Sequence, residues 1–185
     1  IPGSCLLGGK DKLDAKLAKA REALTKPKVE SSGKQPAMAT FEATRPAVGA
    51  QAIGVARAAY EYALQYAQER VAFGKPILRL GGNLERVADA RIAIDQARLL
   101  TLYAAWKIDA VGVKQAMTEI SAIKVVAPGM LQAVVDQAIQ VHGGAGVSND
   151  LPLAGLFAIA RALRFADGPD EVHRAMVARM ELAKY

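Results

Sequence analysis

Three long, alanine-rich stretches with apolar residues at helical spacing constrain the fold of this 185-residue chain more than any other feature. They cover about residues 46–70, 84–112 and 114–142, and glycine and proline residues separate them. At 1.5 Å per residue, such stretches form helices about 36 to 44 Å long. Helices of this length, joined by short breaks, favour an all-α fold, an antiparallel up-and-down helical bundle.

Proline and glycine residues mark where the helices are expected to begin and end. Pro46 is expected in the first turn of the first long helix, where its missing N–H costs nothing. One face of that helix carries Val48, Ala52, Val55, Ala56, Ala59, Ala63 and Ala67. Pro128 falls inside the third stretch, where we expect a kink in one continuous helix. Two shorter helices are expected, from Pro152 to about Phe165 and from Pro169 to the C-terminus, and no segment alternates well enough to predict a strand.

The net charge of +6 is concentrated near the N-terminus, where residues 10–34 include eight basic and four acidic residues. Residues 12–24 are expected to form a short amphipathic helix and residues 31–36 a flexible linker. We therefore divide the chain into residues 1–40, which hold this charged helical insertion and the linker, and residues 41–185, the bundle. The basic segment lacks interleaved aromatic residues, which disfavours nucleic-acid binding and leaves an anion-binding surface as a weaker alternative.

Cysteine, histidine and hydropathy patterns exclude several classes of protein. The single cysteine, Cys5, cannot form an internal disulfide, and His142 and His173 lack the spacing of metal ligands, so no metal site is expected. No apolar run approaches the roughly 18 to 20 residues that span a bilayer, and no signal-peptide pattern opens the sequence. We expect a protein of a reducing compartment, the bacterial cytoplasm or, in a eukaryote, the mitochondrion.

Four motifs follow one another along the chain. They are FEATRP at 41–46, ERVAFGKPI at 69–77, IQVHGGAG at 139–146 and LRFADGPDEVHR at 163–174. In order and spacing they resemble the C-terminal helical domain of acyl-CoA dehydrogenases, and the last resembles a subgroup with the same ADGPDEVH run. Residues 1–8 are similar to the segment that leaves the middle β-domain of that family. The resemblance implies that residues 1–40 begin with this connection, and that the protein is an FAD-dependent oxidoreductase of fatty acid metabolism.

The resemblance assigns the catalytic base to Asp167. Dehydrogenation between Cα and Cβ of an acyl thioester needs a carboxylate that takes the α-proton, in surroundings dry enough to raise its pKa. The commonest members of the family carry glutamate there, and aspartate is shorter by one methylene, about 1.5 Å of reach. From the residues alone, Asp-Gly-Pro-Asp-Glu also suits a helix start with Asp167 as the N-cap, and the two roles are compatible.

The resemblance also places four residues at FAD and one at the substrate. Arg70 and Phe73 match positions on the pyrophosphate and adenosine side of FAD, usually the FAD of a neighbouring subunit. Gln140 and Gly144 match positions near the adenine or pyrophosphate across the subunit interface, and Arg45 matches a position beside the thioester and pantetheine. The residues alone leave other interpretations open. Arg70 could be a cation at the end of a helix, Phe73 a buried aromatic anchor, and Gln140 a solvated polar residue. Gly144 could be a helix C-cap, and Arg45 an exposed residue before a helix.

Some positions depart from the family pattern. Gly81 stands where many members have a glutamine that contacts FAD, Glu42 stands where many have aspartate, and His142 replaces an aromatic residue and is expected to be partly buried. The resemblance implies an acyl-CoA substrate, an electron-transfer flavoprotein or similar acceptor as partner, and a homodimer or homotetramer. The alternative is a noncatalytic oligomerisation module whose alanine-rich faces pair with copies of the chain. Residues 1–185 alone are expected to fold but to be inactive.

Overall fold

The computed structural model describes residues 11, 14–15, 17–19, 21–22 and 36–185. The chain divides into two compact units, residues 1–35 and residues 36–185, and each is described by itself. In the first unit the described residues are helical, in agreement with part of the helix predicted over 12–24. Leu13, Ala20 and Leu24 of that helix lie outside the described residues, as do Cys5 and residues 31–35 of the predicted linker.

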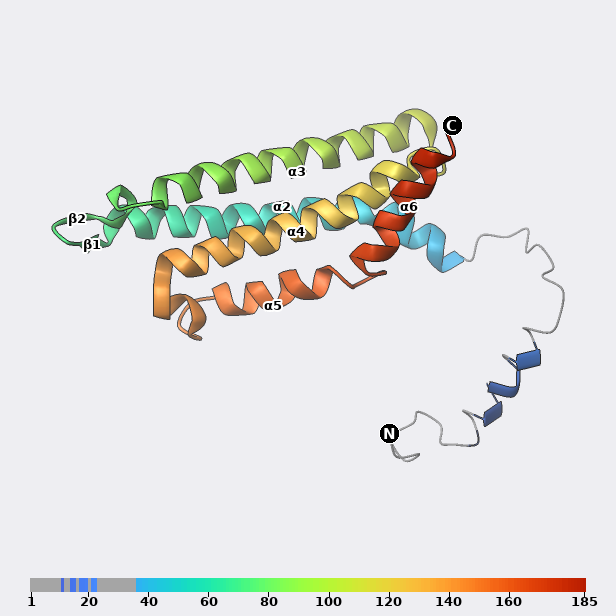
Figure 1. Cartoon of the computed structure of the whole chain (residues 1–185), viewed down its shortest axis with the longest axis horizontal. Coiled ribbons are helices and arrows are strands. Elements are labelled where there is room, and N and C mark those ends of the chain that lie inside the picture. The colour runs from blue at the N-terminus through green and yellow to red at the C-terminus, as the bar shows by residue number, and fades with distance from the viewer. Residues whose placement is uncertain (1–10, 12–13, 16, 20, 23–35) are drawn as a thin grey trace. The chain divides into compact units, whose positions relative to one another are not determined.

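The second unit is an antiparallel up-and-down bundle of long helices, which confirms the predicted all-α fold (Figure 1). Its helices are α2 (Pro36–Glu69), α3 (Asn83–Val111), α4 (Met117–His142), α5 (Leu153–Leu163) and α6 (Asp170–Leu182), with short 3₁₀ segments at Ile77–Arg79 and Gly143–Val147. Successive helices from α2 to α5 run in opposite directions, and α6 lies across the beginning of α4 at one end of the bundle.

The first long helix begins ten residues earlier than predicted, at Pro36 instead of Pro46. Pro46 therefore lies inside α2, where its missing N–H removes one helical hydrogen bond, and the helix continues past it. The extension places Met38, Phe41 and Arg45 on the same helix at spacings of three and four residues, so they share one face. That face lines the candidate site described below.

Helix α4 is central, because it packs against α2, α3, α5 and α6. The core contains small residues from α2 and α3 against larger ones from α4. The buried members are Ala52, Ala56, Ala59, Ala90, Ile94, Ala97, Ala127, Met130, Leu131, Val134, Val135, Ala138, Leu153 and Ala160. Alanine faces allow the helix axes to approach closely. These alanine faces thus pack inside the chain, which does not favour the alternative in which they pair with copies of it.

By length and composition alone, one helix among the described residues would be long and apolar enough to cross a membrane, the stretch Met117–Val147. Of its most apolar window, 56% is buried inside the bundle. A core helix of this kind passes the same test, and Pro128 is itself buried within α4, which continues through it as one helix as predicted. The prediction that no run approaches membrane-spanning length did not take into account how apolar this central helix is.

Helix α3 has a different distribution of apolar residues. Apart from Ile94, its buried positions are small or polar, at Ala90, Ala97, Thr101 and Ala104. Its larger apolar side chains point away from the bundle, and Ile92, Leu99, Leu102 and Trp106 are each more than half exposed. The outer face of α3 therefore carries an apolar stripe that the described residues leave uncovered.

A β-hairpin joins α2 to the segment before α3, where no strand was predicted. Val71–Ala72 (β1) pairs antiparallel with Lys75–Pro76 (β2). The two residues between them, Phe73 and Gly74, have φ of +52° and +77°. Positive φ at both central positions makes this a type I′ turn, which suits the right-handed twist of paired strands. Strands of two residues are too short for an alternating pattern to reveal them.

Candidate functional site

A hollow of about 350 Å³ lies at the end of the bundle where α6 crosses α4. We call it the Asp167 hollow. It is lined by Met38, Phe41, Arg45, Met117, Ser121, Asp167, Gly168, Val172, His173 and Met176. Most of these side chains are apolar, and the few polar groups come from α2, α4, α6 and the turn between α5 and α6. A mainly apolar cavity with a few convergent polar groups is the usual form of a small-molecule site.

Asp167 lies in the turn between α5 and α6 with φ of +54°, and Gly168 follows with φ of +101°. A left-handed backbone is uncommon for a residue other than glycine, and aspartate is among the side chains that tolerate it best. Helix α6 begins at Asp170 with Pro169 as its N-cap, and no side chain caps it. The N-cap interpretation of Asp167 is therefore wrong, and the carboxylate is not occupied by that role.

The main-chain carbonyl of Asp167 accepts hydrogen bonds from two side chains. Arg45 Nη2 on α2 donates to it at 3.5 Å, and His173 Nε2 on α6 lies 3.3 Å from it. Arg45 and His173 are only 6% and 4% exposed. The interpretation of Arg45 as an exposed residue before a helix is thus wrong, since it is buried within α2 and contacts the turn that carries Asp167.

Burial dominates the electrostatics of both side chains. It lowers the pKa of Arg45, although Glu42 and Asp167 act in the opposite direction. It also lowers the pKa of His173 from its ordinary 6.5, and the positive charge of Arg45 adds to that effect, so His173 is neutral at pH 7. Neutral His173 with its proton on Nε2 is the form that can donate to the Asp167 carbonyl.

Two polar atoms of the lining residues are buried without a hydrogen-bond partner in the described part of the chain. They are Arg45 Nε and Ser121 Oγ. Buried polar groups are nearly always paired, so each unpaired one calls for an explanation. An ordered water, or a polar group of a bound molecule that reached these atoms, would satisfy them. The Asp167 side chain itself is exposed, so residues of this chain alone do not provide the dry surroundings expected for a base.

Several residues that hold the turn were not identified from the sequence. Lys124 on α4 donates to the carbonyls of Leu163 and Gly168 at 3.0 and 3.2 Å. Asp170 is buried and accepts from Arg164 Nε at 2.8 Å. One signal for Lys124 was available in the sequence, because it lies in a mostly apolar segment, ISAIKVVAP, and a lysine buried in such a segment needs a hydrogen-bonding partner.

The residues assigned to FAD gather at the other end of the bundle, near the β1–β2 hairpin and the end of α4 (Figure 1). Phe73 is 94% exposed at the tip of the hairpin, so the buried-anchor interpretation is wrong. Arg70 directly follows α2 and is exposed. Gln140 is exposed in the last turn of α4, as a solvated polar residue would be, and Gly144 is exposed just beyond it.

Glycine is not required at Gly144 by the chain itself. A Cβ built there would meet nothing within 4 Å, whereas at Gly146 it would lie 2.7 Å from the Ile139 carbonyl oxygen. The helix C-cap is Gly143, with φ of +61°, so the C-cap interpretation of Gly144 is wrong. His142 is 6% exposed, more buried than expected, and stacks on Tyr62 and Tyr66. The open space beside Gly144 is compatible with a ligand that approaches from outside the chain.

The two groups of residues are far apart. From Arg45 to Glu69 along α2 is roughly 36 Å at 1.5 Å per residue. The first group, at the Asp167 hollow, holds Arg45 and Asp167; the second holds Arg70, Phe73, Gln140 and Gly144. A single cofactor molecule bound beside Asp167 does not reach both ends of the same chain.

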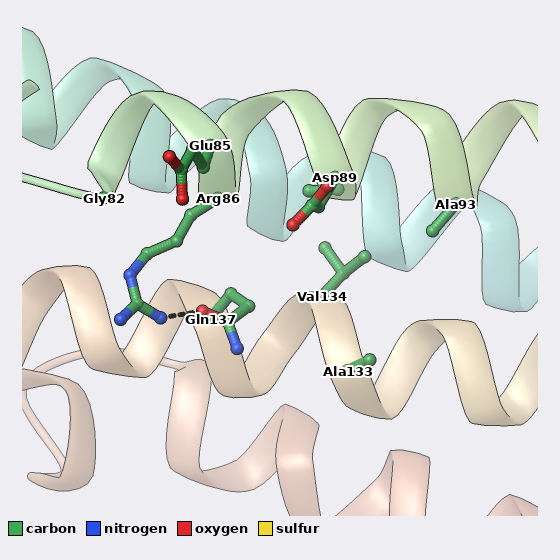
Figure 2. A pocket seen from close by; sticks show the side chains of 9 residues that line it. Gly82, Glu85, Arg86, Asp89, Ala93, Ala133, Val134 and Gln137 are labelled. Carbon is green, nitrogen blue, oxygen red and sulfur yellow. Dashed lines mark hydrogen bonds between the residues drawn. The ribbon is translucent and has the colours of Figure 1, made fainter.

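A second hollow, of about 420 Å³, lies between α3 and α4 (Figure 2). Arg86 reaches across it from α3 and donates to Gln137 on α4, while Glu85 and Asp89 line the α3 side. Both carboxylates are exposed, and none of the residues assigned from the sequence lies in it. No group of three or more histidine, cysteine, aspartate or glutamate residues that could hold a metal ion occurs among the described residues.

Comparison with known proteins bears directly on this arrangement. A family model described as acyl-CoA dehydrogenase, C-terminal domain, matches residues 31–182. The probable acyl-CoA dehydrogenase FadE2 of Mycobacterium tuberculosis is 48% identical over 134 residues, which are 72% of this chain and 33% of that protein. A solved structure of a Mycobacterium abscessus protein assigned as an acyl-CoA dehydrogenase has 60% identity and a TM-score of 0.73, and the match covers 74% of this chain and 34% of that one.

Butyryl-CoA dehydrogenase from Megasphaera elsdenii has the same fold at lower identity. Its structure is 31% identical with a TM-score of 0.73, and the match covers 79% of this chain and 38% of that chain. The chain thus spans between a third and two fifths of the length of these three relatives.

Proposed function

Because this chain belongs to the acyl-CoA dehydrogenase family, of which it carries the C-terminal domain, we propose that it serves the α,β-dehydrogenation of an acyl-CoA thioester. In this reaction a base removes the α-proton and a hydride leaves the β-carbon. Bound FAD would supply the hydride acceptor. The alternative of a noncatalytic oligomerisation module is not favoured, since the alanine-rich faces assigned to it are buried inside the bundle.

The observation that carries the proposal is the arrangement around Asp167. Asp167 is one of the residues that line a mostly apolar hollow, and its main-chain carbonyl accepts hydrogen bonds from Arg45 and His173. An acyl chain suits the apolar walls, and a fixed carboxylate suits a general base. We propose that Asp167 takes the α-proton on a carboxylate oxygen, and that bound acyl-CoA and FAD exclude water from it.

Arg45 is proposed to act on the substrate side. Arg45 lines the hollow and its Nε is buried and unpaired, so we propose that this atom donates to a polar group of the thioester or of pantetheine when substrate binds. Its Nη2 meanwhile donates to the main-chain carbonyl of Asp167. One side chain would therefore link substrate binding to the base.

The other end of the bundle is proposed to hold FAD of a second subunit. The exposed ring of Phe73 suits contact with a planar group, the guanidinium of Arg70 suits phosphate oxygens, and Gly144 leaves room for close approach. Gln140 can both donate and accept there. Because about 36 Å of α2 separates this end from Arg45, a dimer or larger homo-oligomer would supply both ends of each site. Electron-transfer flavoprotein or a similar acceptor would then reoxidise the flavin.

The test is flavin reduction under anaerobic conditions. An intact enzyme that contains this chain, loaded with FAD, is mixed with acyl-CoA substrates of several chain lengths, and the loss of flavin absorbance is followed. Asp167→Asn should slow the bleaching at least about 100-fold while FAD stays bound. Asp109→Asn, at an exposed position on α3, is the matched control and should bleach at the unaltered rate. Undiminished bleaching by Asp167→Asn would remove Asp167 from the mechanism.

A further inference from the structure

Lys124 is a buried ammonium group in the middle of an apolar helix. It lies on α4, and only 6% of the residue is exposed. Its Nζ donates to the carbonyl oxygen of Leu163 at 3.0 Å and to that of Gly168 at 3.2 Å. Both acceptors are main-chain groups, and they lie at the two ends of the turn that carries Asp167.

This pattern differs from that of a structural ion pair. Among the described residues, Lys124 forms no salt bridge, and the nearby carboxylate of Asp170 is bound by Arg164 at 2.8 Å. Burial lowers the pKa of Lys124, and the positive charges of Arg45 and Arg164 add to that effect, although the negative charges of Asp170 and Asp167 act in the opposite direction. A buried lysine without a carboxylate partner is costly, and an apolar side chain of similar length would fill the same space more cheaply.

The geometry explains what the ammonium provides. Leu163 is the last residue of α5, so its carbonyl belongs to the negative end of that helix. Gly168 follows Asp167 directly, and both have positive φ. Lys124 Nζ hydrogen-bonds both the carbonyl at the end of α5 and the carbonyl of Gly168. The two hydrogen bonds fix the distance between the two ends of the turn. A point charge with three donors can serve two carbonyls from one position, which apolar packing cannot do.

We propose that Lys124 is a positioning residue that, through the carbonyls of Leu163 and Gly168, fixes the turn that presents the Asp167 carboxylate to the Asp167 hollow. The inference rests on the proposed function, because it needs Asp167 to be the base. Arg45 and His173 hold the Asp167 carbonyl from the hollow side, and Lys124 holds the turn from the side of α4. Lys124 itself does not line the hollow.

The test compares three variants of the FAD-loaded protein with the wild type. Lys124→Met keeps the length and removes the donors, Lys124→Arg keeps the charge, and Lys107→Met is the control. Lys107 pairs with Glu119 between α3 and α4 at 2.6 Å, and no hydrogen bond or ion pair found among the described residues joins it to the turn. Each variant is measured for the limiting rate of flavin bleaching, the Kd of acyl-CoA, FAD content and Tm.

A turn displaced by about 1 Å costs on the order of 100-fold in rate, so Lys124→Met should lower the limiting bleaching rate by about that factor. The Kd of acyl-CoA and the FAD content should stay within about threefold of the wild type, because Lys124 touches neither the hollow nor the distant end. Lys124→Arg should recover part of the loss, about tenfold below wild type, since its planar fork meets the two carbonyls differently. Lys107→Met should lower Tm and leave the rate unaltered.

Two results would overturn the inference. One is a wild-type limiting rate in folded Lys124→Met; the other is a loss of rate matched by equal losses of acyl-CoA affinity and FAD content, which indicates a general loss of structure. Where Lys124→Met yields no folded protein, Lys124→Arg decides, and an unaltered rate in that variant contradicts the proposal. Asp167→Asn is measured in parallel. If its flavin bleaches at the wild-type rate, the proposed base is wrong. If its bleaching is slow while the Lys124 variants bleach at the wild-type rate, only the role of Lys124 is refuted.

Discussion

Phe73→Asn should stabilise the FAD-free protein, although it deletes a large aromatic side chain. Phe73 is 94% exposed and has φ of +52°. The left-handed conformation costs an ordinary L-residue about 1 to 2 kcal/mol, whereas asparagine tolerates it. Asn-Gly is also the preferred pair for a type I′ hairpin turn.

The loss of apolar burial is too small to cancel this gain. A phenylalanine offers about 150 to 250 Å² to burial, and this one buries about a twentieth of its surface. At about 25 cal/mol per Å², the forfeited burial is worth about 0.3 kcal/mol. The net expectation is a gain of about 1 kcal/mol in the free energy of unfolding, or about 2 to 4 °C in Tm for a chain of this length.

Thermal unfolding followed by far-ultraviolet circular dichroism measures the effect. Phe165→Asn is the matched control, because Phe165 is 58% exposed, lies near Arg161 and has no positive φ. It should lower Tm. A fall in Tm for Phe73→Asn would refute the reasoning, since it would mean that the ring stabilises the chain itself. If the ring serves FAD, the same variant should retain less FAD, so stability and cofactor binding would move in opposite directions.

Three further outcomes follow from single positions. Gly146→Ala should destabilise the bundle by about 1 to 3 kcal/mol in urea unfolding, because its Cβ would lie 2.7 Å from the Ile139 carbonyl oxygen, whereas Gly144→Ala should be neutral for folding. Gly144→Ala should nevertheless weaken FAD retention in a binding titration, if cofactor approaches the open space there. The pKa of His173 is lowered in the folded state, so the unfolded state takes up the proton first as pH falls. This contribution to stability is therefore complete above about pH 6.5 and declines below it. His173→Gln should show a smaller decline in the free energy of unfolding between about pH 7.5 and 5.5, measured by urea titration.

The periodicity of the sequence was sufficient to predict the long helices, because alanine faces and glycine breaks are local features. Of the seven positions predicted for the buried face of α2, Ala52, Ala56, Ala59 and Ala67 are buried, and the other three are partly buried. The start of α2 was misplaced because proline is favoured in a first helical turn and Pro46 was assigned there, yet the helix tolerates it internally. The consequence is functional, since Arg45 was expected before the helix and lies inside it.

The surroundings of Asp167 depend on tertiary packing, which sequence patterns do not contain. Arg45, Lys124 and His173 are separated by at least 49 residues along the chain, and only the packing of α2, α4 and α6 brings them to one turn. The resemblance to the family pointed to Asp167 as the base. Only the structure shows that Asp167 has a positive φ and that no side chain caps α6. The predicted helix over residues 46–70 already placed Arg45 and Arg70 at opposite ends of one helix, and the uninterrupted span of α2 confirms that separation.

The central claim is that the two ends of one chain serve two different flavins, and mixed oligomers test it most directly. One variant carries Asp167→Asn; the other carries Arg70→Ala with Phe73→Asn, and each alone is expected to be inactive. In a dimer that contains one chain of each kind, one site combines an intact Asp167 with an intact distant end. Co-expression should then restore about a quarter of wild-type flavin bleaching, since about half the dimers are mixed and each has one working site. A mixture as inactive as its two components would contradict the claim.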